Sequence, residues 1–198
     1  RHTVIINKSD SDIKLLSAYS ASIDLPMDDY EMIHFAGSWG RERAMHRTKL
    51  EMGMKAEVEN ARGGSGHQLN PFSMITSVGT DETHGEVYGL SLVYSGNHST
   101  VAKIDQFGNL RVQQGINPHQ FEWILKPNES FCTPQSIICY SDSGIGAMTR
   151  EYHDVFRNNL MRSKWVNKKR PILINNWEGT YFDFTEEKLL QMAEKAHK

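Results

Sequence analysis

A glycine-flanked tryptophan is the first feature of this sequence whose chemistry suggests a ligand contact. Trp39 lies in the segment GSWGRER, residues 37–43, and arginine and glutamate side chains follow it at once. A sugar site needs a flat apolar surface for the C–H face of a ring, and charged groups that bind its hydroxyls. The segment supplies both, so it predicts a saccharide contact at Trp39. The alternative is a tryptophan packed under its own loop, with the charged side chains paired on the surface.

A second tryptophan follows a short apolar run near the C-terminus. Residues 172–174 (ILI) do not alternate in polarity, which is typical of a strand covered on both faces. Two asparagines and Trp177 come directly after this run. Because the loops that follow the strands of a (β/α)8 barrel build its active site, we expect Trp177 to line a pocket. The aromatic residues at 181, 182 and 184 are expected to fill the top of the barrel instead.

The glycine-rich segment 59–72 (ENARGGSGHQLNPF) allows its backbone to approach another group closely. It lacks the lysine of a phosphate-binding P-loop, and no clear helix follows it. The segment therefore predicts a structural loop, or a loop that packs on another subunit, rather than a nucleotide site. His67 is a candidate polar contact, although a single loop histidine is more often a structural residue.

Three carboxylates lie close together in the segment 80–89: Asp81, Glu82 and Glu86. Their position at the start of a hairpin favours solvated turn residues over a catalytic acid and base. A galactose mutarotase-like enzyme would need a histidine and a glutamate that converge. Candidate histidines for a pair with Glu86 are His34, His67 and His84. No spacing in the sequence supports such a pair.

Composition and charge limit the class of protein. Of the 198 residues, 38% are hydrophobic and 23% charged, which is ordinary for a soluble domain. The formal net charge of −2 and the single short basic run at 164–170 argue against nucleic acid as the main partner. No apolar run approaches the roughly 18 residues of a membrane span.

Two cysteines and the N-terminal residues suggest a cellular context. Cys132 and Cys139 give neither a disulfide framework nor a metal-ligand spacing, so we expect buried thiols in a reducing compartment. The N-terminal RHTVIINKSD has no apolar region of a signal peptide. Because the sequence opens with arginine inside a strand-like run, we expect it to be an excerpt of a longer chain.

Strand patterns dominate the first two thirds of the sequence. They cover residues 3–7, 13–23, 31–36, 86–95, 101–107, 110–114, 121–125 and 131–140. Strands at a spacing of roughly ten residues with Gly/Asn turns between them predict an antiparallel β-sandwich.

The period changes after residue 141. Apolar residues at three- and four-residue steps predict an amphipathic helix over residues 144–165. The apolar run 172–174 then predicts a strand, and Thr185 is a good N-cap for a final helix. A strand followed by a helix is the first half of a parallel βαβ unit, so we expect the parallel domain to continue beyond the final residue.

Several of these segments together resemble bacterial α-galactosidases (melibiases) of glycoside hydrolase family 36. The likeness rests on GSWGRER…HRTKL, RGGSGHQLNPF, GEVYGLSLVYSGN, VQQGINP and RPILINNWEGTYFDFTEEKLL, and it extends from about residue 33 to the end. It implies that residues 1–142 form most of a galactose mutarotase-like β-supersandwich that lacks its first strands. Residues 143–169 would form a linking helix, and residues 170–198 the first βα unit of a (β/α)8 barrel.

The resemblance also implies a function. The family hydrolyses terminal α-linked galactose, as in melibiose and raffinose, with retention, which requires two carboxyl groups about 5 Å apart. Its two catalytic aspartates lie in downstream motifs that are absent here, so we assign no catalytic residue, metal or cofactor and expect these residues alone to be inactive. Trp39 and Trp177 match family positions that contact substrate. Gly66 stands where serine is usual in the family, and Gly179 where alanine is usual.

The family resemblance further implies a homotetramer in the cytoplasm that acts on α-galactoside oligosaccharides, with no nucleic-acid or membrane partner. In such a tetramer, Trp39 would act on a neighbouring subunit's site. The alternative is a non-catalytic carbohydrate-binding or interaction module, for which an exposed Trp39 would serve equally well. The strand and helix expected at the C-terminus argue against that alternative, because a free-standing binding module does not need them.

Overall fold

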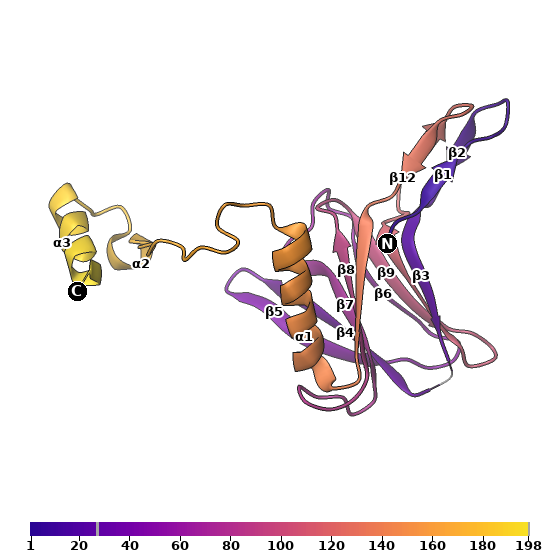
Figure 1. The fold of residues 1–198 in the computed structure, drawn as a ribbon, viewed down its shortest axis with the longest axis horizontal. Coiled ribbons are helices and arrows are strands. Elements are labelled where there is room, and N and C mark those ends of the chain that lie inside the picture. Colours follow the sequence, from indigo (N-terminus) through magenta and orange to yellow (C-terminus); the bar gives the residue numbers. More distant parts are fainter. Residues whose placement is uncertain (27, 198) are drawn as a thin grey trace. The chain divides into compact units, whose positions relative to one another are not determined.

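The computed structural model describes residues 1–26 and 28–197. It divides into two compact units, Arg1–Val155 and Phe156–Lys198, hereafter the β unit and the C-terminal unit. The β unit consists of antiparallel strands and the helix α1 (Gly144–Val155) (Figure 1).

Two main sheets form the β unit. The five-stranded sheet has the order β13 (Gln135–Ser141), β8 (Val87–Val93), β7 (Leu69–Ser77), β4 (Tyr30–Ser38) and β5 (Arg41–Lys49). The four-stranded sheet has the order β3 (Tyr19–Leu25), β10 (Leu110–Ile116), β9 (His98–Ile104) and β6 (Lys55–Asn60). All pairs of neighbouring strands in these sheets are antiparallel, which confirms the predicted β-sandwich class.

The core lies between the two sheets, where strands that alternate apolar and polar residues turn their apolar side chains inward. In β10, Leu110 and Val112 are fully buried while Arg111 between them is exposed. Met32 and Ile75 from the five-stranded sheet join the same apolar cluster. Two faces of opposite sheets therefore share one core, as alternating strands require.

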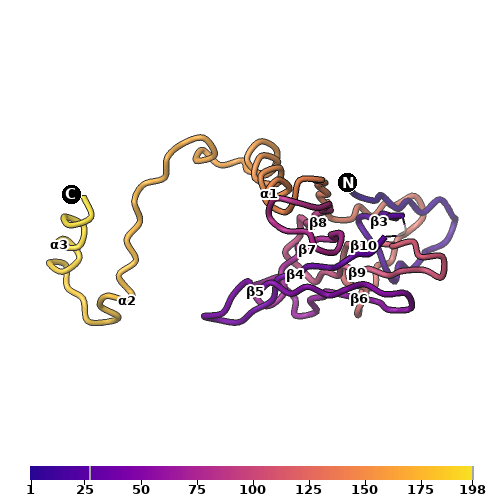
Figure 2. The backbone as a smooth tube through the Cα atoms, turned by 90° about the horizontal axis from the view of Figure 1, so that it is seen from below, coloured from indigo at the N-terminus to yellow at the C-terminus, as the bar shows by residue number. Residues whose placement is uncertain are grey.

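Helix α1 covers the outer face of the five-stranded sheet, where it packs on β8 and β13 (Figure 2). The Tyr152 hydroxyl donates to the Ile137 carbonyl oxygen at 2.8 Å, and its ring meets Phe72 edge-on at 5.5 Å. Gly89 of β8 lies beneath the helix, where a Cβ would come within 2.6 Å of Tyr152 and 2.7 Å of Met148. The helix thus belongs to the β unit, and this close approach requires glycine.

Two short ribbons complete the β unit. One pairs β1 (Val4–Ile6) with β12 (Ser130–Cys132), and the other pairs β2 (Ile13–Leu15) with β11 (Trp123–Leu125). Trp123 and Phe131 join the ribbons through rings 5.2 Å apart. The single strand pattern expected over residues 13–23 is therefore two strands in different sheets. Cys132, expected to be buried, is exposed on β12, and Cys139 is partly buried.

The strand patterns missed three strands, β5, β6 and β7. Strand β5 is exposed along nearly its whole length, so its sequence has no apolar alternation. Strand β7 contains Pro71, which normally argues against a central strand. Here the β4–β7 register shifts between His34 and Ala36, and Pro71 lies within that irregularity.

The C-terminal unit contains less regular structure than the sequence predicts. The helix expected over 144–165 is α-helical only to Val155 and continues as one π-helical segment, η1 (Phe156–Leu160). The segment 172–174 forms no strand among the described residues, and Ile172 and Leu173 are 80% and 90% exposed. A strand needs a neighbour for its hydrogen bonds, and the described chain pairs none with this run. Two helices follow, α2 (Trp177–Thr180) and α3 (Glu186–His197).

Candidate functional site

Trp39 lies at the tip of the β4–β5 hairpin. Strand β4 ends at Ser38 and β5 begins at Arg41, so Trp39 and Gly40 form a two-residue turn. Gly40 has φ of +75°, a conformation that glycine adopts without strain. The Trp39 side chain is 89% exposed. The alternative of a tryptophan packed under its own loop is therefore wrong.

Backbone contacts hold this tip in place. The Gly40 N–H donates to Glu42 Oε1 at 2.9 Å, and the Gly37 N–H donates to the Gln68 carbonyl oxygen at 3.2 Å. Backbone N–H groups of Glu42 and Gly40 lower the pKa of the Glu42 carboxyl, with smaller contributions from His67 and Arg43. The hairpin extends past the neighbouring strands of its sheet (Figure 2). A large apolar ring is thus presented to solvent on a fixed turn, beside charged groups.

Two of the three candidate histidines for a mutarotase-like pair, His34 and His84, have other neighbours. His34 stacks on His46 across the hairpin, with ring centroids 5.2 Å apart, and burial lowers the pKa of His34. His84 Nδ1 lies 3.4 Å from Asp81 Oδ1. Among the described residues, no hydrogen bond joins any histidine to Glu86, which instead accepts from the Tyr140 hydroxyl at 3.0 Å.

The Asp81 carboxylate stabilises a tight turn, as expected from its place at the start of a hairpin. Asp81 Oδ1 accepts the backbone N–H groups of Thr83 at 2.7 Å and His84 at 2.8 Å. These two bonds lower the pKa of Asp81 from 3.8 to about 2. The arrangement fixes a turn and gives no pair of carboxylates set for acid and base chemistry.

Replacing Asp81 with alanine is expected to destabilise the β unit in a pH-dependent way. Because the folded pKa is depressed, the carboxylate contributes its full stabilisation above about pH 4 and loses it as the pH falls towards 2. The difference in unfolding temperature between Asp81→Ala and the unmodified protein should therefore be larger at pH 5 than at pH 3. A difference that stays constant between these two pH values would contradict the assigned pKa shift.

Trp177 lies in an aromatic cluster of the C-terminal unit. Its ring meets the rings of Tyr181 and Phe182 edge-on, with centroids 5.5 and 5.0 Å away. The Asn175 side-chain oxygen accepts the Trp177 N–H at 3.0 Å, and the Asn176 amide donates to Thr180 Oγ1 at 2.9 Å. Trp177 is 45% exposed, so part of its ring remains accessible. The two asparagines therefore position the start of α2 and, with it, Trp177.

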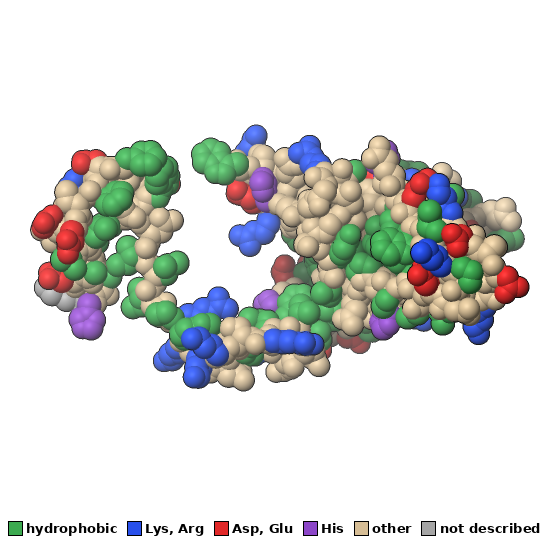
Figure 3. Space-filling model, turned by 90° about the horizontal axis from the view of Figure 1, so that it is seen from above, with side chains coloured by type: hydrophobic (Ala, Val, Ile, Leu, Met, Phe, Trp, Pro, Cys, Tyr) green, Lys and Arg blue, Asp and Glu red, His purple; other side chains and the backbone are tan. Residues whose placement is uncertain are grey.

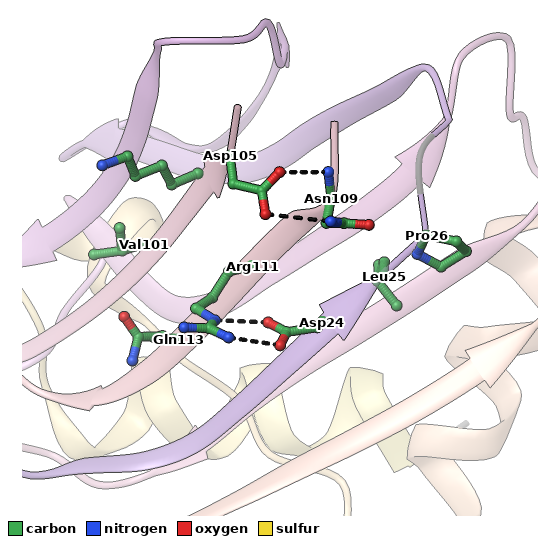
Figure 4. Close-up of a pocket in the computed structure, with 9 residues that line it drawn as sticks. Asp24, Leu25, Pro26, Val101, Asp105, Asn109, Arg111 and Gln113 are labelled. Atoms are coloured by element: carbon green, nitrogen blue, oxygen red, sulfur yellow. Dashed lines mark hydrogen bonds and ion pairs between the residues drawn. The ribbon is translucent and has the colours of Figure 1, made fainter. Parts of the chain in front are cut away.

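A polar cleft that the sequence analysis missed lies on the outer face of the four-stranded sheet (Figure 4). Its volume is about 620 Å³. Arg111 Nε and Nη2 each lie 2.7 Å from a different oxygen of Asp24, and Asp105 accepts from Asn109. The bond from Arg111 lowers the pKa of Asp24. Sequence spacing gives no signal for this cleft, because strand register alone brings Arg111 opposite Asp24.

The surface of the described chain carries mixed charge. Acidic, basic and hydrophobic side chains are interspersed on the face of the β unit that Figure 3 presents. Among the described residues, no group of three histidine, cysteine or carboxylate side chains is placed to hold a metal ion. None of the helices in the described part of the chain is long and apolar enough to cross a membrane.

Two protein-family models match this chain in succession. The model of the glycosyl hydrolase family 36 N-terminal domain matches residues 1–126, and the melibiase model matches residues 130–198. Together they cover nearly the whole chain, and the boundary between them falls just before β12.

Curated relatives show the same similarity. The chain is 50% identical over 190 residues to the alpha-galactosidase AgaA of Geobacillus stearothermophilus, a match that covers 96% of this chain and 26% of the relative. It is 40% identical over 198 residues to the alpha-galactosidase Mel36A of Lactobacillus acidophilus, covering 100% of this chain and 27% of that protein. The chain therefore spans about a quarter of the length of the relatives it matches.

Solved structures agree with the fold. A variant of AgaA from Geobacillus stearothermophilus in complex with raffinose has a TM-score of 0.90 and 47% identity, covering 98% of this chain and 27% of that one. Another AgaA variant, in complex with stachyose, has a TM-score of 0.89 and 48% identity, covering 97% of this chain and 27% of that one.

Proposed function

Since the chain belongs to glycoside hydrolase family 36, we propose that it is the N-terminal portion of a retaining α-galactosidase. The full-length protein, meaning a polypeptide as long as the relatives, would remove terminal α-galactose from oligosaccharides of the melibiose and raffinose type. The observation that carries this proposal is the ordered match of both family models along the chain. The raffinose and stachyose complexes of the AgaA variants support the substrate class.

In this proposal, the two units contribute binding groups and no catalytic carboxylate. Trp39 stacks on a sugar ring, which its exposure and its fixed turn support. Trp177 lies beside the galactose, and its partly accessible ring supports this position. Residues 143–169 link the domains, and residues 170–198 begin the catalytic barrel, where strand 172–174 would form beside its neighbouring strand.

The proposal includes a homotetramer in the cytoplasm, in which Trp39 of one subunit reaches the site of another. The exposure of Trp39 and of β5 supports such a reach. Light scattering of the full-length protein tests the assembly, and a monomer would remove the contact between subunits from the proposal.

Replacing Trp39 with alanine in the full-length protein is expected to raise KM more than it lowers kcat. The loss of one aromatic stacking partner should cost about 1 to 3 kcal/mol of binding free energy. The measurement is steady-state hydrolysis of raffinose. Trp123→Ala is the matched control, because Trp123 is a half-exposed tryptophan of the same unit that packs on Phe131. An unchanged KM in Trp39→Ala would remove Trp39 from the site.

A further inference from the structure

A cleft of about 630 Å³ lies beside the turn of the hairpin that carries Trp39, because Gly37, two residues before Trp39, forms part of its wall. It is lined by Gly37 of β4 and by residues of the segment 59–69, and we name it the glycine-loop cleft. Gly37 is also the residue whose N–H donates to the Gln68 carbonyl oxygen. The cleft and the hairpin therefore share a wall and form one continuous surface of the β unit.

The backbone around the glycine-loop cleft is fixed by hydrogen bonds. The Gly63 N–H donates to Asn97 Oδ1 at 2.6 Å, and the Ser65 N–H donates to the Ser95 carbonyl oxygen at 2.7 Å. The Asn60 side chain accepts the Arg62 N–H at 3.0 Å and donates to the Gly64 carbonyl oxygen. A loop held in this way binds a ligand without a large ordering cost.

Three polar side chains of the cleft wall remain available to a ligand. Among the described residues, the side chains of Arg62, His67 and Gln68 make no hydrogen bond with another protein group. The cleft in Figure 4 differs in this respect, because Arg111 and Asp24 satisfy each other there. These three side chains are exposed, so hydroxyl groups of a ligand can bind them in place of water.

The chemistry of the lining favours a neutral, polyhydroxylated ligand. Glu59 and Arg62 carry opposite charges, so the cleft selects strongly for neither an anion nor a cation. The Gln68 amide offers both a donor and an acceptor, and Leu69 adds an apolar surface. A volume of about 630 Å³ is in the range of small-molecule sites, about 300 to 1,000 Å³.

We propose that the glycine-loop cleft binds the sugar units of an α-galactoside that lie farthest from the cleaved bond. This inference rests on the proposed function and extends it to substrate length. Trp39 at the hairpin tip would contact a sugar nearer the bond, and the adjoining cleft would hold the next units. The cleft therefore increases activity on longer oligosaccharides and contributes nothing to a short aryl α-galactoside.

Gly66 allows a sharp test, because its backbone is outside the left-handed region and a Cβ there would meet nothing within 4 Å. A tyrosine at this position places a large side chain at the wall of the cleft, and its Cβ has room there. In the full-length protein, Gly66→Tyr is expected to lower kcat/KM for stachyose about tenfold and to leave kcat/KM for an aryl α-galactoside unchanged. Arg62→Met is a second variant with the same expected direction. Gly66→Ala and Arg111→Gln are controls, and neither should change kcat/KM for either substrate.

Three results would overturn the cleft assignment. The first is an equal loss of kcat/KM for stachyose and for the aryl α-galactoside, and the second is an unchanged kcat/KM for stachyose in both variants. The third is a change of oligomeric state in light scattering, which would assign the cleft to a subunit contact. If the unmodified protein hydrolyses neither substrate, the proposed function fails by itself. Calorimetry with stachyose then tests the cleft assignment separately. Gly66→Tyr should weaken stachyose binding about tenfold. Equal binding by the variant and the unmodified protein, or no binding by either, would refute the assignment.

Discussion

These 198 residues alone are expected to release no product from an aryl α-galactoside, whereas the full-length protein is expected to hydrolyse it. Retaining hydrolysis needs a nucleophile and an acid/base about 5 Å apart around the scissile bond. Two carboxylates of the segment 80–89, Asp81 and Glu86, instead bind backbone N–H groups and the Tyr140 hydroxyl. Because enzymes accelerate such reactions at least about 10⁶-fold, we expect hydrolysis by the full-length protein to be readily measured and that of the short chain to equal the uncatalysed background.

The measurement compares both polypeptides at equal molar concentration with the same aryl substrate. Activity in the full-length protein and none in the 198-residue chain supports catalysis downstream of this chain. Activity in the short chain would show that the catalytic carboxylates lie within it. Inactivity of both would favour the carbohydrate-binding module, and binding of raffinose without hydrolysis would then be the decisive observation.

Replacing Tyr152 with alanine is expected to lower the free energy of unfolding of the β unit by about 3 to 5 kcal/mol. Tyr152 is only 4% exposed, and its ring packs between Phe72 and the backbone of Gly89. Burial raises the pKa of its phenol, so the hydroxyl stays protonated and donates to the Ile137 carbonyl oxygen. The alanine variant loses both the packing and this hydrogen bond.

The conservative variant separates the two contributions. Tyr152→Phe keeps the ring and should cost only about 1 kcal/mol, the usual net value of one hydrogen bond. Urea unfolding followed by fluorescence measures both variants. If Tyr152→Ala loses less than the phenylalanine variant is expected to lose, α1 is not part of the cooperative core of the β unit.

The sequence predicts a strand where one face of that strand is buried, because burial requires apolar residues at alternate positions. Strand β10 alternates buried Leu110 and Val112 with exposed Arg111, and this alternation predicts the strand from the sequence. Strand β5 is exposed on both faces, so nothing in its residues marks it as a strand. It is held by its ladder to β4 alone, which is a tertiary property. Similarly, residues 172–174 need a neighbouring strand that the described chain does not provide.

The candidate site is predictable to a similar degree. The glycines and charged residues beside Trp39 predict a contact there, and the structure explains both glycines. Gly40 has a positive φ in the turn, and a Cβ at Gly37 would collide with the Arg41 carbonyl oxygen. The sequence alone suggested a loop, because the strand that follows Gly40 has no pattern. The Asp24–Arg111 pair depends on β3–β10 register over a separation of 87 residues, and no local reading reveals such a pair.

The composition of β5 also affects the behaviour of the protein in concentrated solution. As the last strand of its sheet, β5 offers one row of backbone groups to any chain that approaches it. Its sequence RERAMHRTK places arginine or lysine at four of nine positions, so two such edges repel each other on approach. Charged edges of this kind oppose aggregation through intermolecular sheet extension. The same residues that surround Trp39 therefore help to keep an exposed hairpin from joining copies of the protein into fibres.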